Sequence, residues 1–211
     1  MDLPSTARPG QLRRERRREA VAARLMEQGL KLMAQKGLTA CKVEEITKAA
    51  GVGKGTFFTH FPSKQAFVVR LVDMVLSDLA RRVGTLGPAN QGAQSLVAGV
   101  GGVHLRFFQL RQDAAQLITQ ALCLTQDGPE GEEIKARMQR HLDLVASLLA
   151  PASEQMGWPR ERSGELALCL LALSCGFFSF GRPLGLGQDT PAPLVERMGR
   201  VLAQGLGKET L

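Results

Sequence analysis

The chain has 211 residues, of which 44% are hydrophobic and 22% charged, and its formal net charge is +7. This composition is that of an ordinary globular protein and argues against a disordered or fibrous chain. The basic excess is N-terminal: residues 1–82 hold 16 Lys and Arg against 8 Asp and Glu, whereas residues 83–211 hold 11 against 12. A basic end on a near-neutral body is typical of proteins with a polyanionic partner, a nucleic acid or an anionic membrane, although composition alone slightly favours a solvated tail.

The sequence indicates a cytoplasmic protein that does not enter a membrane. The longest nearly unbroken apolar run, at 166–180, is shorter than the ~20 residues of a membrane-spanning helix, and serine and glycine interrupt it. No apolar signal segment follows the N-terminal arginines. The cysteines form no CxxC pair and suit a reducing compartment; they are Cys41, Cys123, Cys169 and Cys175.

Helical spacing organises the basic end. Apolar residues three and four apart predict a first helix over about 12–36, and Gly37 is a natural helix stop. The same spacing predicts a second, short helix over 43–50. It ends at Gly51, which can take the left-handed conformation that a tight turn requires.

Two further helices complete this part of the chain. Phe57 and Phe61 lie four residues apart on a third short helix, where we expect them in the core. Pro62 closes that helix, and Ser63 can cap the next one. An apolar stripe then predicts a fourth helix over 64–82.

The segment GVGKGT at 51–56 has two interpretations. A nucleotide-phosphate loop of the form GxxxxGK[ST] follows a strand, but here Lys48, inside a predicted helix, occupies the position of its first glycine. Gly55 follows Lys54 in place of the hydroxyl residue that binds magnesium. A helix, a glycine turn and a second short helix is instead the arrangement that places a recognition helix in the DNA major groove. We therefore favour a DNA-binding element.

Five short strings between residues 24 and 71 occur in a specific order: KG at the end of the first helix, EEI in the second, AGV in the turn, KGTFF in the third and HFPSK before the fourth. This order resembles the DNA-binding domain of the TetR family of bacterial one-component transcriptional regulators. The resemblance implies an all-α fold. An N-terminal three-helix helix-turn-helix domain with a linking helix, residues 1–82, would be joined to a larger helical bundle for ligand binding and dimerisation, residues 83–211.

The resemblance also implies a set of DNA contacts. Residues at the start of the recognition helix approach base edges, where lysine can donate to guanine and a threonine methyl can contact thymine. Phe58 stands where the family usually has a phosphate-binding tyrosine, so that contact is lost or replaced by apolar packing. His60 and Lys64 match positions that hold the DNA backbone. The predicted DNA-binding residues are Lys42, Gly53, Lys54, Gly55, Thr56, Phe58, Thr59, His60 and Lys64.

Other interpretations of these residues stay open. Cys41 stands where a hydroxyl residue usually caps the second helix, and Gly53 where serine often caps the third, so both helix starts should be weakened by up to ~1 kcal/mol. Without the motif, His60 is read as a structural histidine and Lys64 as a solvated lysine. The run RRERRRE at 13–19 is equally the exposed opening of the first helix or a basic arm for the minor groove.

The second half of the chain is predicted to be helical without a sign of catalysis. It contains no HExxH, GxSxG or paired-carboxylate spacing, and its His and Cys spacings fit no metal-ligand pattern. We therefore expect no catalytic residue, metal or cofactor. The helices are predicted near 92–111, 112–126, 131–156, 161–180 and 191–206, separated by Gly/Pro breaks.

Two sets of residues in this half bear on function. The family commonly pairs its last two helices with their copies in a second subunit, and burial within one subunit is the alternative. Candidate dimer contacts are Leu166, Leu170, Leu173, Phe177, Leu194, Met198, Val201 and Leu202. Candidates for a ligand cavity are His104, Arg106, Phe107, Met138, His141, Trp158 and Phe177, each of which is individually more often plain core or surface. Arg106 is the candidate for binding an anionic end.

Together these features indicate a homodimeric, ligand-responsive transcriptional regulator. We expect a repressor that binds an inverted-repeat operator in double-stranded DNA and is released by a small, mainly apolar effector, neutral or weakly anionic. Two other classes remain open: a basic peripheral-membrane or scaffold protein, and a small enzyme in the helical half. Sequence-dependent DNA binding would exclude the first, and turnover of a bound molecule would establish the second.

Overall fold

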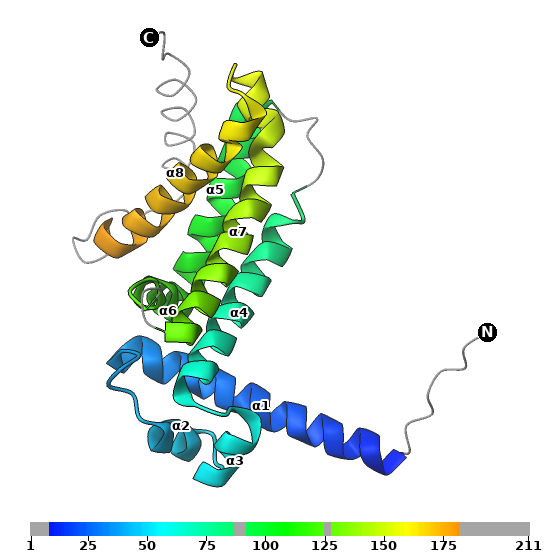
Figure 1. Ribbon diagram of the computed structural model, residues 1–211, viewed down its shortest axis with the longest axis vertical. Helices are drawn as coiled ribbons and strands as arrows, with labels where there is room; N and C mark the ends of the chain where they lie inside the picture. Colours follow the sequence, from blue (N-terminus) through cyan, green and yellow to red (C-terminus); the bar gives the residue numbers. More distant parts are fainter. Residues whose placement is uncertain (1–8, 87–91, 125–127, 182–211) are drawn as a thin grey trace. The chain divides into compact units, whose positions relative to one another are not determined.

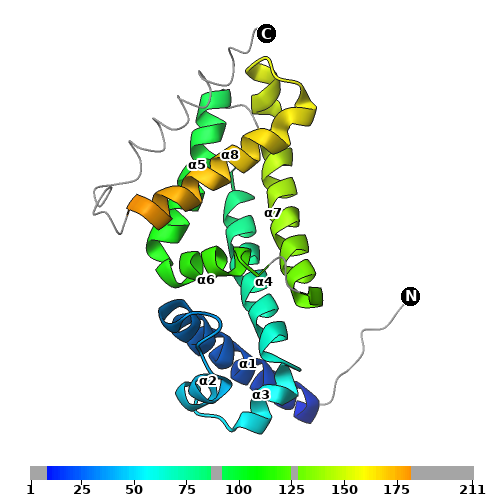
Figure 2. The same cartoon turned by 60° about the vertical axis from the view of Figure 1, so that its left-hand side comes forward.

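The computed structural model describes residues 9–86, 92–124 and 128–181, and in these ranges the regular structure is entirely helical (Figures 1 and 2). The expected all-α fold is confirmed. The chain divides into two compact units, Met1–Leu71 and Val72–Leu211. The division falls inside α4 (Lys64–Val83), whereas the sequence analysis placed it after this helix. The first residues of α4 therefore belong to the N-terminal unit and the rest to the C-terminal unit.

The N-terminal unit is built from three helices and the start of α4. Gly37 ends the first helix at a φ of 93° and donates its N–H to the Met33 carbonyl at 2.9 Å. Gly51, at a φ of 64°, forms the turn between the second and third helices. Both glycines were predicted as stops, because only glycine takes this conformation without strain. The helices are α1 (Pro9–Lys36), α2 (Val43–Ala49) and α3 (Lys54–His60).

Three phenylalanines form the core of this unit. Phe57 and Phe67 are fully buried, and Phe61 nearly so. Their ring centroids lie 5.1 Å apart for Phe57 and Phe67 and 4.7 Å apart for Phe61 and Phe67. Helix α1 packs directly on this cluster at Gly29, where an added Cβ would lie 2.3 Å from the Phe67 ring. The predicted core role of Phe57 and Phe61 is confirmed.

The C-terminal unit is a bundle in which α5, α7 and α8 pack on one another, with α6 running across them (Figure 2). Arg137 of α7 joins α7 to α4, because its guanidinium contacts Asp73 of α4 at 3.2 Å. The same guanidinium contacts Glu133 of its own helix at 3.1 Å. The predicted helix at 191–206 lies outside the described residues. The elements are α5 (Ala93–Leu110), α6 (Gln112–Leu122), α7 (Gly128–Gln155) and α8 (Ser163–Gly176), the last between a 3₁₀ turn, Arg160–Arg162, and a π-helical turn, Phe177–Gly181.

Candidate DNA-binding surface and ligand cavity

The GVGKGT segment forms the turn and the beginning of the second helix of a helix-turn-helix. The Val52 N–H donates to the Thr47 carbonyl at 2.9 Å, which ties the turn to the end of α2. Gly53 is the N-cap of α3, and its missing side chain leaves that helix without a side-chain cap, as predicted. A helix precedes the turn, so the strand that a nucleotide-phosphate loop requires is absent from this place.

Helix α3 has one buried side and one exposed side. Phe57 anchors it to the core, while Lys54, Gly55 and Thr59 are exposed and Thr56 is half-buried. Most of the predicted base-contacting residues therefore lie on the solvent side of the helix. Phe58 is also exposed, with 47% of its surface accessible, so this large apolar ring is presented to solvent instead of filling the core.

Lys54 is held by an acidic residue of the preceding helix. Its ammonium forms an exposed ion pair with the Glu44 carboxylate of α2, and this contact lowers the pKa of Glu44. The pair orients the Lys54 side chain along the exposed side of the two helices. It also places a negative charge beside a residue that we predicted to bind DNA.

Helix α2 begins at Val43, as predicted, but its cap differs from the prediction. The N-cap is Lys42, not Cys41, and the Glu45 carboxylate accepts the Lys42 backbone N–H at 2.9 Å. Glu45 also pairs with Lys36 of α1, so one carboxylate caps α2 and links it to α1. Cys41 is fully buried, and burial raises the pKa of its thiol. Glu45, inside the helix, thus supplies a cap in place of the one that was predicted to be missing at Cys41.

His60 and Lys64 flank the loop that leads into α4. His60 is half-buried, and burial, with a smaller effect from the nearby Arg18, lowers its pKa. Lys64 is half-buried and donates from Nζ to the Thr39 carbonyl at 2.8 Å, so it also has a structural role. Ser63 caps α4 as predicted, because its Oγ accepts the Ala66 N–H at 2.9 Å.

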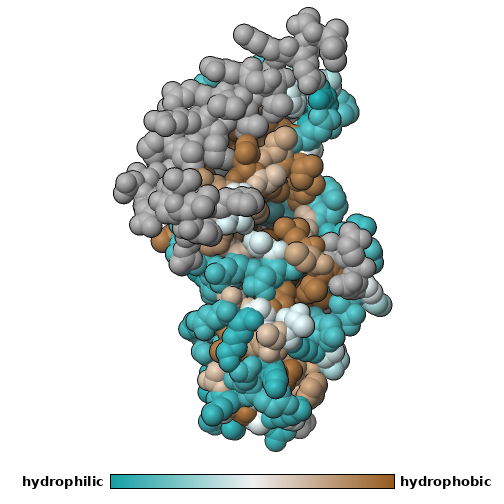
Figure 3. All heavy atoms as spheres, turned by 90° about the vertical axis from the view of Figure 1, so that its left-hand side faces the viewer, coloured by the Kyte–Doolittle hydropathy of each residue, from teal (hydrophilic) through white to brown (hydrophobic). Residues whose placement is uncertain are grey.

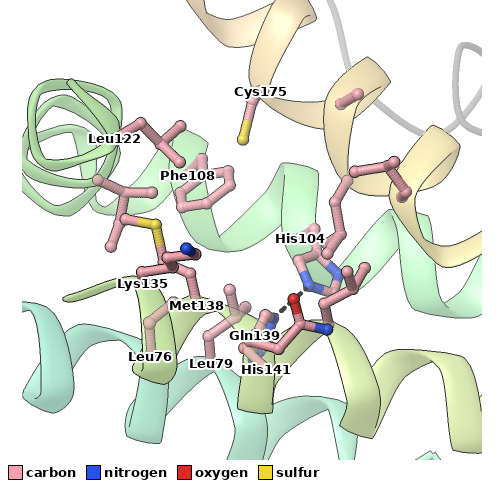
Figure 4. A pocket seen from close by; sticks show the side chains of 15 residues that line it. Leu76, Leu79, His104, Phe108, Leu122, Lys135, Met138, Gln139, His141 and Cys175 are labelled. Atoms are coloured by element: carbon pink, nitrogen blue, oxygen red, sulfur yellow. Dashed lines mark hydrogen bonds between the residues drawn. The ribbon is translucent and has the colours of Figure 1, made fainter. Parts of the chain in front are cut away.

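The C-terminal unit contains a cavity of about 410 Å³ with an almost entirely apolar wall (Figure 4). Helices α4, α5, α6, α7 and α8 all contribute to it. Of the predicted lining residues, His104, Met138 and His141 are in place. Phe108 lies in the segment 102–110, which the sequence also indicates as possible lining. The remaining lining residues were not predicted: Leu76, Leu79, Ile118, Leu122, Lys135, Gln139, Leu142, Leu168, Leu171, Ala172 and Cys175.

Two histidines from different helices meet in the cavity wall. His104 of α5 and His141 of α7 are both buried, and their Nε2 atoms lie 3.0 Å apart (Figure 4). His104 Nδ1 lies 2.8 Å from the Val100 carbonyl, an acceptor that requires Nδ1 to carry the proton. Neutral His104 then accepts at Nε2 from the Nε2–H of His141. This order leaves His141 Nδ1 as a buried acceptor without a partner among the described residues.

Four other predicted cavity residues lie elsewhere. Arg106 is exposed on the outer side of α5, so it does not supply an anion-binding group to the cavity. Phe107 is buried beneath the Arg82 guanidinium, which lies 5.3 Å from its ring centroid. Trp158 is stacked with Arg162 at 4.6 Å. Phe177 begins the π-helical turn after α8 and is half-buried.

Helix α8 is apolar on nearly all sides, but only one side is covered. Leu166 and Leu170 are buried within the unit, which corrects their assignment to a subunit interface. Leu168 and Leu173 remain 57% and 42% exposed. Hydrophobic side chains gather on the face of the molecule that carries α8 (Figure 3). The other predicted interface residues, Leu194, Met198, Val201 and Leu202, lie outside the described residues.

The turns that flank α8 lengthen the apolar segment beyond the run seen in the sequence. Residues Arg160–Ser179 form 20 continuous helical residues that are long and apolar enough to cross a membrane, and 28% of this stretch is buried. Length therefore does not exclude a membrane span, contrary to the expectation from the sequence. A core helix or a helix at a subunit interface meets the same criterion.

Comparison with known proteins identifies the N-terminal unit. Residues 25–71 match the family described as bacterial regulatory proteins, tetR family. The HTH-type transcriptional repressor DhaR of Mycobacterium sp. (strain GP1) is 37% identical over 68 residues, which are 32% of this chain and 34% of that protein. The uncharacterised HTH-type transcriptional regulator YuxN of Bacillus subtilis is 41% identical over 49 residues, 23% of this chain and 17% of that protein. The match spans about a third of DhaR and less of YuxN.

Solved structures share the fold over most of the chain. The transcriptional regulator FadR from Bacillus subtilis, solved in complex with stearoyl-CoA, superposes with a TM-score of 0.70 at 16% identity, covering 87% of this chain and 98% of that one. A putative transcriptional regulator from Pseudomonas aeruginosa superposes with a TM-score of 0.69 at 19% identity, covering 97% and 94%. At these identities the likeness establishes the fold alone.

Proposed function

We propose that this chain, which belongs to the TetR family of bacterial transcriptional regulators, is a repressor that binds an inverted-repeat operator as a homodimer and leaves it when a small apolar effector enters the C-terminal cavity. The observation that carries the proposal is the exposed side of α3, which follows a glycine turn and presents Lys54, Gly55 and Thr59 to solvent. A short helix presented in this way fits the major groove.

The proposed contacts fall into two classes. Lys54 and Thr56, at the start of α3, would reach base edges and read sequence, and Gly53 and Gly55 would allow the backbone to come close. Lys42, Phe58, Thr59, His60 and Lys64 would contact sugar and phosphate and set the register. Lys64 keeps this role although it bonds Thr39, because an ammonium group has three donors and the carbonyl uses one.

The proposed dimer rests on the exposed side of α8. Leu173 of α8 is a large apolar side chain exposed outside the cavity wall, whereas the exposed Leu168 lines the cavity. A twofold dimer would bury Leu173 and would present two copies of α3, which explains why we expect an inverted-repeat operator. Residues 182–211, which include the predicted last helix, would complete the interface.

The proposed effector has a mainly apolar body. The cavity volume of about 410 Å³ lies near the lower end of small-molecule sites, and its wall offers few polar groups. Lys135 is a cation in that wall, with 65% of its side chain exposed, so it can meet an anionic end at the mouth. Because FadR from Bacillus subtilis was solved with stearoyl-CoA, we propose a compound with an acyl chain, and Lys135 takes the role that we first gave to Arg106.

Helix α4 offers a route from the cavity to the DNA. Leu76 and Leu79 line the cavity, and the same helix begins at Lys64 in the N-terminal unit. An effector that binds better when α4 is tilted would favour a state in which the two recognition helices of the dimer are not spaced to fit the two half-sites of the operator. A ~100-fold difference in affinity between the two states would supply about 2.7 kcal/mol per site toward release.

The DNA-binding proposal is tested by selecting duplexes from a random pool and measuring their affinity by fluorescence anisotropy. We expect an inverted repeat. The Lys54→Ala variant should lose ~1 to 3 kcal/mol of binding and relax the preference at one base position. Lys31→Ala, which removes an exposed ion-paired lysine from α1, is the charge-matched control and should leave that preference intact. Selection of no common sequence, or an equal loss of base preference in both variants, would contradict the proposal.

The effector proposal needs a separate experiment. Acyl compounds of increasing chain length are screened for a rise in Tm, and those that stabilise the protein are added to the operator complex. Compounds that raise Tm should release the DNA, and Met138→Trp, which fills the cavity, should weaken both effects. If stabilising compounds never alter operator affinity, the cavity is not a sensor.

A further inference from the structure

The first turns of α1 extend beyond α2 and α3 within the N-terminal unit (Figures 1 and 2). Residues 10–20 are all exposed, and the first partly covered residue is Val21. Eleven helical residues span about 16 Å at 1.5 Å per residue. This part of α1 is therefore a projecting helix that contributes nothing to the core of the unit.

Four of the five arginines of this projection share one side of the helix, and the fifth, Arg16, lies about 60° outside that group. Each residue turns the helix by about 100°, so positions i, i+1, i+4 and i+5 fall within about 140° of one another. Glu15 and Glu19 lie one turn apart on another side. We call the first group the arginine face; it consists of Arg13, Arg14, Arg17 and Arg18.

The arginine face is unfavourable without a polyanion. Arg13 and Arg17, and likewise Arg14 and Arg18, are like charges at i and i+4, a spacing at which repulsion destabilises an isolated helix. No carboxylate among the described residues forms an ion pair with any of these four. A row of phosphates would relieve the repulsion and satisfy the guanidinium donors.

The position of the arginine face relates it to DNA. Arg18 is near enough to His60, the last residue of α3, for its charge to act on that imidazole. The face thus begins beside the end of the proposed recognition helix and continues away from it. A lipid surface fits less well, because an interfacial helix needs an apolar side, and Leu12 is the one large apolar residue from 10 to 20.

We propose that the arginine face binds the phosphates of the duplex that flanks the sequence read by α3, so that full affinity requires DNA longer than the operator. The inference rests on the proposed DNA-binding function. With base pairs 3.4 Å apart along each strand, a 16 Å projection reaches about four to five base pairs beyond each half-site. The contacts are to phosphate and are independent of sequence.

The test compares two operator duplexes, one ending at the inverted repeat and one with about eight extra base pairs of arbitrary sequence on each side. Wild-type protein should bind the longer duplex at least 10-fold more tightly. A variant with Arg13, Arg14, Arg17 and Arg18 all changed to Gln should bind both duplexes equally. Its salt dependence on the long duplex should be shallower by roughly three to four units of log K per log salt for each subunit.

Control measurements distinguish a failure of this inference from a failure of the proposed DNA-binding function. The E15Q/E19Q variant, which alters the other side of the same helix, should keep the dependence on duplex length. Preference for the operator over a scrambled duplex should survive in the four-Arg variant, and its Tm should be unchanged or slightly higher, because these side chains are exposed and their mutual repulsion is removed. If wild-type protein itself shows no sequence preference, the result contradicts the proposed DNA-binding function.

Two outcomes would overturn the inference itself. One is equal wild-type affinity for the short and the long operator. The other is binding to phosphatidylserine vesicles that the four-Arg substitution abolishes while the dependence on DNA length stays intact, which would assign the face to a membrane.

Discussion

The hydrogen bond between the two histidines of the cavity wall requires that Nε2 of His104 stay unprotonated, because that atom is the acceptor. Burial lowers the pKa of His104, and burial together with the nearby His104 lowers the pKa of His141 from 6.5 to about 4. If both rings were protonated, the two Nε2 atoms would become donors facing each other at 3.0 Å. The pair is therefore a source of acid sensitivity.

We predict that stability falls as the pH drops from 6.5 toward 4. The unfolded chain binds a proton at His141 near pH 6.5, whereas the folded chain resists it until about pH 4, so acid favours unfolding across this window. The loss should approach ~3 kcal/mol, at about 1.4 kcal/mol per unit of pKa. About 2 kcal/mol of this loss should appear between pH 7.5 and pH 5 in urea unfolding, and His141→Leu should flatten the difference. An equal pH dependence in both proteins would show that other groups cause it.

A second residue-scale prediction concerns Gly29. Replacing it with alanine places a Cβ 2.3 Å from the fully buried Phe67 ring, and the surrounding core leaves that ring little room to move. We expect Gly29→Ala to destabilise the protein by ~1 to 3 kcal/mol, the usual range for overpacking. Gly55→Ala is the control, because nothing lies within 4 Å of its added Cβ, and it should leave stability unchanged or raised by up to ~1 kcal/mol. Both values come from chemical denaturation.

At the scale of helices, we predict that the ion pair between Glu44 of α2 and Lys54 of α3 limits DNA binding. Glu44 would compete with the DNA for Lys54 and would bring a negative charge to the proposed interface. Glu44→Gln should raise the affinity for any duplex several-fold and make its salt dependence steeper by about one unit. Glu27→Gln removes the partner of Lys31 on α1 and is the matched control. If both variants bind DNA alike, Glu44 is remote from the duplex.

The helices of the N-terminal unit could be predicted from sequence because their signals are local. Apolar spacing marks the buried sides, and Gly37 and Gly51 mark the ends with conformations that other residues avoid. The start of α2 was predicted correctly, but its cap was not, because the cap comes from Glu45, a glutamate inside the helix, whereas we looked for a hydroxyl before it. The segment at 161–180 has no apolar period, so the end of α8 at Gly176 left no signal.

Apolar periodicity in the sequence does not identify which residues line the cavity. His104, Met138 and His141 were identified because polar or flexible residues stand out on apolar helices. Leu76 and Leu79 of α4 were not, since a leucine that lines a void carries the same signal as one that fills a core. The assignment of Leu166 and Leu170 to an interface failed for a related reason. On a helix that is apolar all round, sequence does not tell which side the bundle covers.

At the scale of the whole molecule, the proposed function depends on two copies of the chain. One short recognition helix makes few contacts, and tethering two of them raises the apparent affinity by 10² to 10⁴ without any new contact. The exposed side of α8 is the described surface on which we base the dimer. A charge on that side should therefore abolish operator binding from a distance, although the DNA-reading residues stay unchanged.

Leu173→Glu is the variant that tests this dependence. Leu173 is 42% exposed, lies on α8 and does not line the cavity, so the substitution should disturb neither the core nor the effector site. A carboxylate buried there in each subunit of the dimer would meet no partner, which is costly enough to separate the subunits. We expect wild-type dimers and Leu173→Glu monomers at micromolar concentration in sedimentation velocity, with operator affinity reduced at least 100-fold. Leu110→Glu, at a leucine that is 70% exposed on α5, should remain dimeric and bind normally. Wild-type monomers would refute the dimer, whereas dimers of Leu173→Glu would move the interface away from this side of α8.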